Sequence, residues 1–156
     1  MKRSVLVLAL SLCFSSAFAA GDFHGKAVRV LDGDTVDVLT AQNQTVRVRL
    51  ANIDAPEKSQ AFGQRSRQNL TSLIAGRMVD VHVQNQDQYG RKVGRVVADG
   101  VEANTEQVRA GLAWVYTRYN QDRRLPAIEA QAKREQLGLW SDPQPLEPWM
   151  YRRQNK

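Results

Sequence analysis

Alternation of apolar and polar residues restricts the fold of this chain most strongly, and it dominates the sequence up to residue 54. Three segments are rich in valine and leucine at every second position: residues 25–31, 35–40 and 45–53. Asp32-Gly33 and Asn43 lie between these segments as turn formers. Because a period of two is typical of half-buried strands, we predict a three-stranded meander. In its third strand Val46, Val48 and Leu50 share the aliphatic face.

The pattern changes after Pro56, which ends strand pairing. Residues 62–75 carry Leu70, Leu73 and Ile74 at helical spacing, and Gly76 ends the segment. We expect two further strands at 78–83 and 92–98, with a polar loop between them, and two further helices at about 102–110 and 125–137. Five short strands with a helix after the third predict an α+β fold, in which helices pack on a small Greek-key barrel.

The 156 residues fit one domain better than two. Residues 1–19 have the composition of a signal peptide, with a basic start, an apolar run and Ala17-Phe18-Ala19 before the cut. We therefore predict an exported protein, periplasmic or secreted, with no membrane association once the leader is removed. Residues 20–141 are the expected domain, and 142–156 an extended, proline-containing tail that Trp149 and Tyr151 attach to it. Removal of the only cysteine, Cys13, excludes disulfide and thiol chemistry in the mature chain.

Acidic residues gather in the first half of the predicted barrel. Five of the sixteen fall within 26 residues: Asp32, Asp34, Asp37, Asp54 and Glu57. The meander folds this segment back on itself, so its carboxylates repel one another unless a positive group lies between them. Oxygen ligands favour a hard divalent cation. The alternative is a set of solvated acids in turns.

Arginine is the main basic residue of the chain. The formal net charge is +6, and after residue 19 arginine outnumbers lysine by 15 to 5. The planar guanidinium suits phosphate oxygens. Arg49 precedes Asp54 by five residues, and Arg91 follows Tyr89-Gly90 in the loop between the last two predicted strands. A cation beside two arginines indicates a phosphate site. The alternative for Arg47 and Arg49 is a pair of surface arginines.

Four motifs together resemble the staphylococcal nuclease (thermonuclease) family in order and spacing. They are Leu31-Asp-Gly-Asp-Thr-Val36, Arg49-Leu-Ala-Asn-Ile-Asp-Ala-Pro-Glu57, Asp87-Gln-Tyr-Gly-Arg91 and the segment 129–140 that ends in Leu-Gly-Leu-Trp. The resemblance extends from about residue 25 to 141. It implies a five-stranded OB-fold barrel with three helices. It also implies Ca²⁺-dependent hydrolysis of DNA and RNA phosphodiesters, which leaves 3′-phosphate ends.

The resemblance also assigns roles by matched position. Asp34 and Asp54 match calcium carboxylates, and Ala55 matches a ligand that binds through its backbone carbonyl. Glu57 matches the carboxylate that positions or deprotonates the attacking water. Arg49 and Arg91 match the two arginines that bind the phosphate. Asp32 and Thr35 match residues near the metal, and Tyr89 matches an aromatic residue beside the nucleotide.

Two departures from the family pattern affect substrate binding and leave the metal and phosphate residues intact. The segment between Glu57 and the first helix is shorter than the mobile, lysine-rich loop of the best-known member. Thr117 falls where a base-stacking tyrosine is expected, and the nearby Trp114, Tyr116 and Tyr119 are candidate substitutes, of which we select Tyr119.

Two rival functions remain open at this point. A non-catalytic OB-fold module that binds nucleic acid explains the arginines, yet it gains nothing from carboxylates that repel the phosphate backbone. A calcium-stabilised structural domain explains the acids and leaves both arginines without a role. The nuclease explains both sets, with DNA and RNA as substrates, and we expect it to be monomeric. The two histidines, His24 and His82, are too few and too separate for a histidine-based nuclease.

Overall fold

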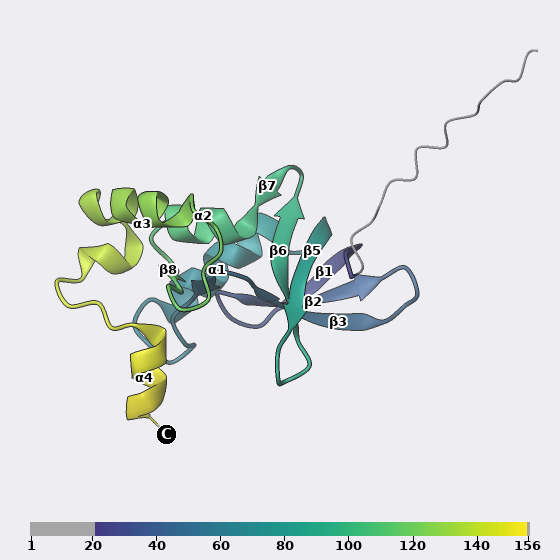
Figure 1. The fold of residues 1–156 in the computed structure, drawn as a ribbon, viewed down its shortest axis with the longest axis horizontal. Coiled ribbons are helices and arrows are strands. Elements are labelled where there is room, and N and C mark those ends of the chain that lie inside the picture. Colours follow the sequence, from purple (N-terminus) through teal and green to yellow (C-terminus); the bar gives the residue numbers. More distant parts are fainter. Residues whose placement is uncertain (1–20, 156) are drawn as a thin grey trace, which may run out of the picture.

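A computed structural model describes residues 21–155 of the chain, so the predicted leader lies outside the described residues. Four antiparallel pairings and one parallel pairing close a barrel of five strands (Figure 1). These strands are β1 (Phe23–Val30), β2 (Thr35–Thr40), β3 (Thr45–Leu50), β5 (Met78–Gln86) and β6 (Lys92–Ala98). The parallel pairing of β3 with β6 closes the barrel, with Val48 opposite Lys92 and Leu50 opposite Gly94. The predicted Greek-key OB fold of the α+β class is confirmed.

The predicted third strand, 45–53, is divided in two. β3 ends at Leu50, and Asn52 adopts a left-handed backbone conformation with φ of 70°. Asparagine tolerates that conformation better than most residues. The next two residues form the short strand β4 (Ile53–Asp54), which pairs with β8 (Trp114–Val115) in a separate two-stranded sheet. A further short strand, β7 (Val101–Glu102), pairs antiparallel with the end of β6. The break at Asn52 turns the acidic segment after β3 away from the barrel wall.

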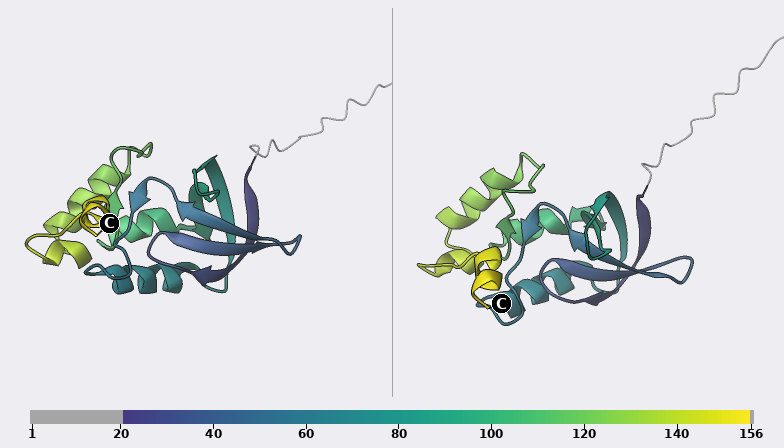
Figure 2. Two further views of the ribbon diagram at one scale, coloured as in Figure 1. Left: turned by 90° about the horizontal axis from the view of Figure 1, so that it is seen from below. Right: turned by 60° about the horizontal axis from the view of Figure 1, so that its bottom comes forward.

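Helices gather at one end of the molecule, and the β2–β3 hairpin extends from the other (Figure 2). The elements are α1 (Gly63–Ile74), α2 (Ala103–Arg109), α3 (Leu125–Arg134), the 3₁₀ helix η1 (Gly138–Ser141) and α4 (Pro148–Gln154). The first three confirm the predicted helices within a few residues at each end. α3 ends at Arg134, three residues before the predicted position 137. Gln136, two residues beyond the helix, has a left-handed backbone conformation with φ of 53°.

The larger of two hydrophobic clusters fills the barrel and continues beneath the helices. It includes the fully buried Val36, Val48 and Leu50 from the meander and Leu70 and Ile74 from α1. This confirms the aliphatic face predicted for the third strand, although Val46 is only half-buried. Within residues 21–155 no helix has the length and apolar character needed to cross a membrane.

The C-terminal segment differs from the predicted extended tail, because residues 148–154 form helix α4. Pro148 stands in the first turn, where its missing N–H costs no helical hydrogen bond. Trp149 stacks on Tyr116, with ring centroids 5.3 Å apart and planes inclined by 4°. The hydroxyl groups of Tyr151 and Ser59 lie 2.9 Å apart. Both aromatic residues therefore attach the tail to the body, as the sequence indicated, but from a helix.

Candidate active site

The turn between β1 and β2 presents two of the predicted acidic residues. The Asp32 carboxylate accepts a hydrogen bond of 3.0 Å from the backbone N–H of Asp34, which fixes the turn locally. Gly33 is packed so tightly that a Cβ there would collide with Ser66 of α1 and with Ala55. The buried Gln107 of α2 donates a hydrogen bond to the Gly33 carbonyl. Side chains from two helices therefore hold this turn in place.

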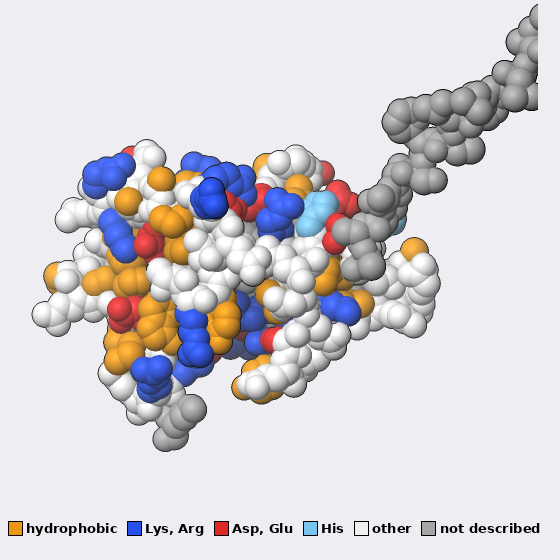
Figure 3. All heavy atoms as spheres, viewed as in Figure 1, with side chains coloured by type: hydrophobic (Ala, Val, Ile, Leu, Met, Phe, Trp, Pro, Cys, Tyr) orange, Lys and Arg blue, Asp and Glu red, His pale blue; other side chains and the backbone are white. Residues whose placement is uncertain are grey.

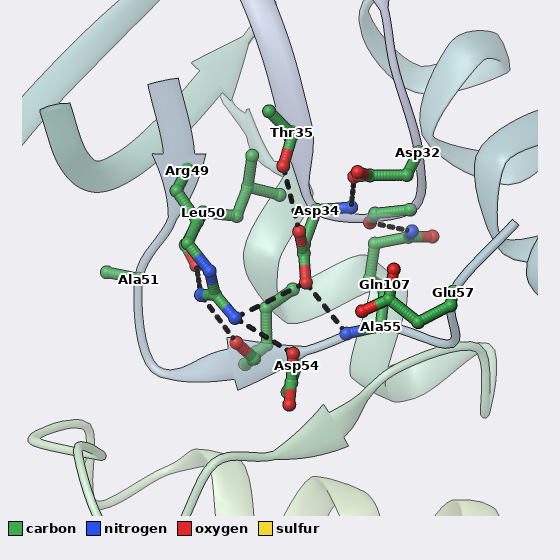
Figure 4. Close-up of polar contacts among 12 residues, drawn as sticks. Asp32, Asp34, Thr35, Arg49, Leu50, Ala51, Asp54, Ala55, Glu57 and Gln107 are labelled. Carbon is green, nitrogen blue, oxygen red and sulfur yellow. Dashed lines mark hydrogen bonds and ion pairs between the residues drawn. The ribbon is translucent and has the colours of Figure 1, made fainter. Parts of the chain in front are cut away.

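Asp34 and Asp54, which are twenty residues apart in the chain, converge on one arginine. Nη2 of Arg49 lies 2.9 Å from Oδ1 of Asp54 and 3.5 Å from Oδ2 of Asp34. Oδ2 of Asp34 also accepts a hydrogen bond of 2.8 Å from the backbone N–H of Ala55. Figure 4 shows Arg49 reaching from β3 toward both carboxylates. The folded-back meander thus brings the predicted metal-binding residues into one cluster.

Arg49 is held by the backbone as well as by the acids. Its Nη1 donates to the carbonyls of Leu50 and Ile53, at 3.1 and 3.0 Å, around the break between β3 and β4. Burial of the guanidinium opposes its charge, but the carboxylates of Asp34 and Asp54 outweigh this effect and raise the pKa of Arg49. The side chain is therefore a fixed, permanently charged donor at the bottom of the site.

The two residues predicted to support the metal site, Asp32 and Thr35, both contact Asp34. The Thr35 hydroxyl donates a hydrogen bond of 3.0 Å to Oδ1 of Asp34, so both oxygens of Asp34 are oriented (Figure 4). Burial, assisted by the negative charge of Asp34, raises the pKa of Asp32 to about 6. Burial also raises the pKa of Asp54, against the opposing hydrogen bond from an arginine of α4. Both shifts report an excess of negative charge in a poorly solvated place.

Arg91 and Tyr89 line the opposite wall of the same pocket, on the loop that joins β5 to β6. Nε of Arg91 donates a hydrogen bond of 2.7 Å to Asp87, so its fork is held by Asp87 and has no direct contact with the Asp34 cluster. Burial opposes ionisation of Asp87, but the hydrogen bonds from Arg91 prevail and lower its pKa. Tyr89 is 75% exposed.

An aromatic group forms the third wall. Tyr119 is 57% exposed, and its ring meets the edge of Tyr116 with centroids 4.9 Å apart. One face of Tyr116 is already covered by Trp149 of α4. The rings of Tyr89 and Tyr119 are therefore more accessible to an incoming base than Tyr116, which the sequence also offered as a candidate.

Glu57 lies at the rim of the cluster, and it has a partner that the sequence did not suggest. Arg152 of α4 donates a hydrogen bond of 2.8 Å from Nη1 to Glu57. The same guanidinium donates to both oxygens of Asp54, at 3.2 and 2.7 Å. Arg152 follows Asp54 by 98 residues. No local pattern predicts this contact, because it depends on the folding of the tail into a helix.

These residues surround a pocket of about 1120 Å³. Figure 3 shows the surface hollowed between α4 and the β5–β6 loop, with basic and acidic side chains meeting inside. The pocket combines fixed arginine donors, several carboxylates and exposed aromatic rings. Such a lining suits a ligand that has phosphate groups and bases.

The cluster has the donor type and charge for a divalent cation. Within residues 21–155 no three His, Cys, Asp or Glu side chains surround a common point, so a cation there would need backbone or water oxygens besides Asp34 and Asp54. Calcium accepts such mixed oxygen ligands. The cluster has four carboxylates and two guanidinium groups, which leaves an excess of two negative charges. Its members are Asp32, Asp34, Asp54 and Glu57, with Arg49 and Arg152. The residues therefore fit calcium, with Ala55 beside them.

Comparisons with known proteins agree with this geometry. Residues 47–142 match the family model described as "Staphylococcal nuclease homologue". An "Uncharacterized endonuclease" of Escherichia coli O157:H7 is 48% identical over 140 residues, which are 89% of this chain and 91% of the relative. The "Micrococcal nuclease" of Shigella flexneri is 44% identical over 161 residues, 96% and 92% of the two chains. An "Uncharacterized endonuclease" of Haemophilus influenzae is 38% identical over 158 residues, 100% and 89% of the two chains.

The OB barrel, the pocket and these relatives define a nucleic-acid hydrolase, a nuclease. The chain belongs to the staphylococcal nuclease family. The family resemblance noted from the four motifs is thereby confirmed, and the reading of the domain as a module without catalysis is set aside. The individual roles of the site residues stay predictions.

Proposed function

We propose that this nuclease is calcium-dependent, cleaves both DNA and RNA, and leaves 3′-phosphate ends. The observation that carries the proposal is the meeting of Asp34 and Asp54 at one nitrogen of Arg49, in a cluster of side chains with two uncompensated negative charges. Calcium bound to Asp34, Asp54 and the backbone carbonyl of Ala55 would neutralise phosphate charge and orient water. Neither a binding module nor a structural domain accounts for both the acids and the arginines.

The protein's own residues supply the rest of the chemistry. Arg49 and Arg91 donate charge-assisted hydrogen bonds to the phosphate oxygens, and these bonds strengthen as negative charge accumulates in the transition state. Glu57 at the rim accepts the proton of the attacking water. Tyr89 and Tyr119 stack on the bases beside the scissile bond.

A cation series tests the proposal directly. Purified protein is incubated with single-stranded DNA and with RNA, in the presence of calcium, magnesium or a chelator. We expect cleavage of both polymers with calcium and no cleavage with the chelator. The DNA products should prime a polymerase only after phosphatase treatment, which is the property of 3′-phosphate ends. Binding without cleavage would contradict the proposal, and activity with magnesium alone would contradict the cofactor.

Export is a second proposal and rests on the sequence of residues 1–19. We propose cleavage after Ala19, release of the chain to the periplasm or medium, and activity there as a monomer. Calcium outside the cytoplasm suits a site built from two carboxylates. The mature protein should begin at Ala20 by N-terminal sequencing of the exported fraction. Recovery of chains that still begin at Met1 in the cytoplasm alone would contradict export.

A further inference from the structure

Arg152 is a cation that already occupies the carboxylates of the proposed metal site. Its Nη2 lies 2.7 Å from Oδ2 of Asp54, and its Nη1 lies 3.2 Å from Oδ1 of the same residue. Nη1 also lies 2.8 Å from the carboxylate of Glu57. One guanidinium therefore bridges the predicted metal ligand and the predicted proton acceptor, and it comes from a helix beyond residue 142, where the family match ends.

Asp54 offers little room for a second cation. Its side chain is 1% exposed, and Oδ1 is already shared between Arg49 and Arg152. Its other oxygen accepts the shorter hydrogen bond from Arg152. A calcium ion bound through Asp54 must take one of these oxygens, and its charge repels a guanidinium at the same place. Arg49 is fixed by two backbone carbonyls, so Arg152 is the group that can leave.

The Arg152 side chain has a way out that does not require the helix to move. It is 38% exposed, so its far side faces solvent. α4 is held independently by the stacking of Trp149 on Tyr116 and by the hydroxyl contact between Tyr151 and Ser59. Rotation about the Arg152 side-chain bonds is therefore sufficient to uncover Asp54.

We propose that Arg152 sets the calcium affinity of the site by competing with the ion for Asp54 and Glu57. In the calcium-free protein it neutralises the buried carboxylate and stabilises the fold. When calcium binds, the guanidinium turns outward while α4 stays docked. This inference rests on the proposed function, since it takes Asp54 to be a ligand of the metal.

Calorimetric titration of the full chain with calcium chloride, without nucleic acid, tests the competition. Arg152→Gln removes the guanidinium that hydrogen-bonds to Asp54 and whose charge repels the ion. This variant should therefore bind calcium about tenfold more tightly than the wild type. Arg153→Gln is the matched control, because Arg153 is exposed and, within residues 21–155, its side chain donates a hydrogen bond only to the Met150 sulfur, at 3.9 Å. It should bind like the wild type. Arg152→Lys keeps the positive charge but loses the planar fork. Its calcium affinity should lie between those of the wild type and Arg152→Gln.

Thermal unfolding gives a second reading that does not depend on calorimetry. Without calcium, Arg152→Gln should unfold at a lower temperature than the wild type. Addition of calcium should raise the unfolding temperature of Arg152→Gln by more than that of the wild type. A role of Arg152 confined to holding α4 would lower the transition under both conditions and leave calcium affinity unchanged. Should Arg152→Gln fail to fold, Arg152→Lys carries the same comparison.

The outcomes separate this inference from the proposed function. Equal or weaker calcium binding by Arg152→Gln would overturn the competition and leave the metal site standing, provided that Asp54→Asn abolishes binding in the same assay. Calcium binding that survives in Asp54→Asn, or is absent from every variant, would overturn the metal site and the competition together.

Discussion

Two arginines on the same strand, Arg47 and Arg49, have different environments although the sequence makes them look equivalent. Arg47 donates to Asp37 at 2.8 Å and is half exposed. Arg49 stands at the end of β3, where the break before β4 surrounds it with carbonyls and carboxylates. Arg47 is thus a surface arginine, whereas Arg49 lies in the carboxylate cluster, where its contact with phosphate stays a prediction. Alternation alone gave both residues the same face, because it contains no information about where the strand breaks.

Replacement of Arg49 by lysine tests its role at this scale. A lysine keeps the charge but loses the planar fork, so Arg49→Lys and Arg91→Lys should each lower kcat by about 100- to 1000-fold while the protein stays folded. Circular dichroism checks the fold and single-turnover cleavage of DNA gives the rate. Arg47→Lys is the control and should keep nearly full activity. A loss below tenfold for Arg49→Lys or Arg91→Lys would remove that residue from the phosphate site.

The pH dependence of stability tests Asp37, the partner of Arg47. Hydrogen bonds from Arg47 and from Arg29 lower the pKa of Asp37 from its ordinary value of 3.8 in spite of its burial. The unfolded chain therefore binds the proton first as the pH falls. The stability from Asp37 is complete above about pH 4 and is lost as the pH drops through the lowered native pKa.

Urea unfolding at several pH values measures this effect. At neutral pH, Asp37→Asn should be less stable than the wild type by about 1–3 kcal/mol, the usual cost of a lost charge-assisted hydrogen bond. The difference should shrink as the pH is lowered below 4. A difference that stays constant down to pH 2 would contradict the ion pairs of Asp37.

At the scale of elements, the short helix α2 orders the site from outside the pocket, which none of its residues lines. Asn104 accepts a hydrogen bond from the Val96 N–H and donates to the carbonyls of Ala51 and Gly94, which joins β6 to the end of β3. Gln107 donates to Gly33 and to Ser66. Both side chains are almost fully buried. The sequence pattern predicts the helix but not these roles, because polar residues in a short helix usually face solvent.

Gln107→Leu tests this support. The substitution leaves the Gly33 carbonyl without its buried donor, so stability should fall by about 1–3 kcal/mol. The Asp32–Asp34 turn should loosen, and calcium affinity should fall with it. Gln131→Leu on α3 is the control, since Gln131 is exposed and its side chain donates a hydrogen bond of 2.9 Å to the neighbouring Glu135. Unfolding in urea and calcium titration give the two measurements. An unchanged calcium affinity in Gln107→Leu would show that the turn holds its shape without α2.

At the scale of the whole molecule, sequence reasoning succeeded where the signal was periodic or where motifs carried a family pattern. Alternation gave the meander, and the meander predicted the meeting of Asp34 with Asp54. The α4 helix was missed because three prolines indicate an extended chain, whereas Pro148 occupies the one helical turn that accepts it. Arg152 was missed for the same reason. Its contacts form only when α4 packs on the pocket through Trp149.

In the proposed mechanism, the cation, the phosphate and the guanidinium groups meet at a single location. A crystal structure of the protein with calcium and a phosphorothioate dinucleotide measures this most directly. We expect an ion bonded to carboxylate oxygens of both Asp34 and Asp54 at about 2.3–2.6 Å, with the thiophosphate against Arg49 and Arg91. An ion bound away from these two aspartates, or a thiophosphate that contacts neither arginine, would contradict the account.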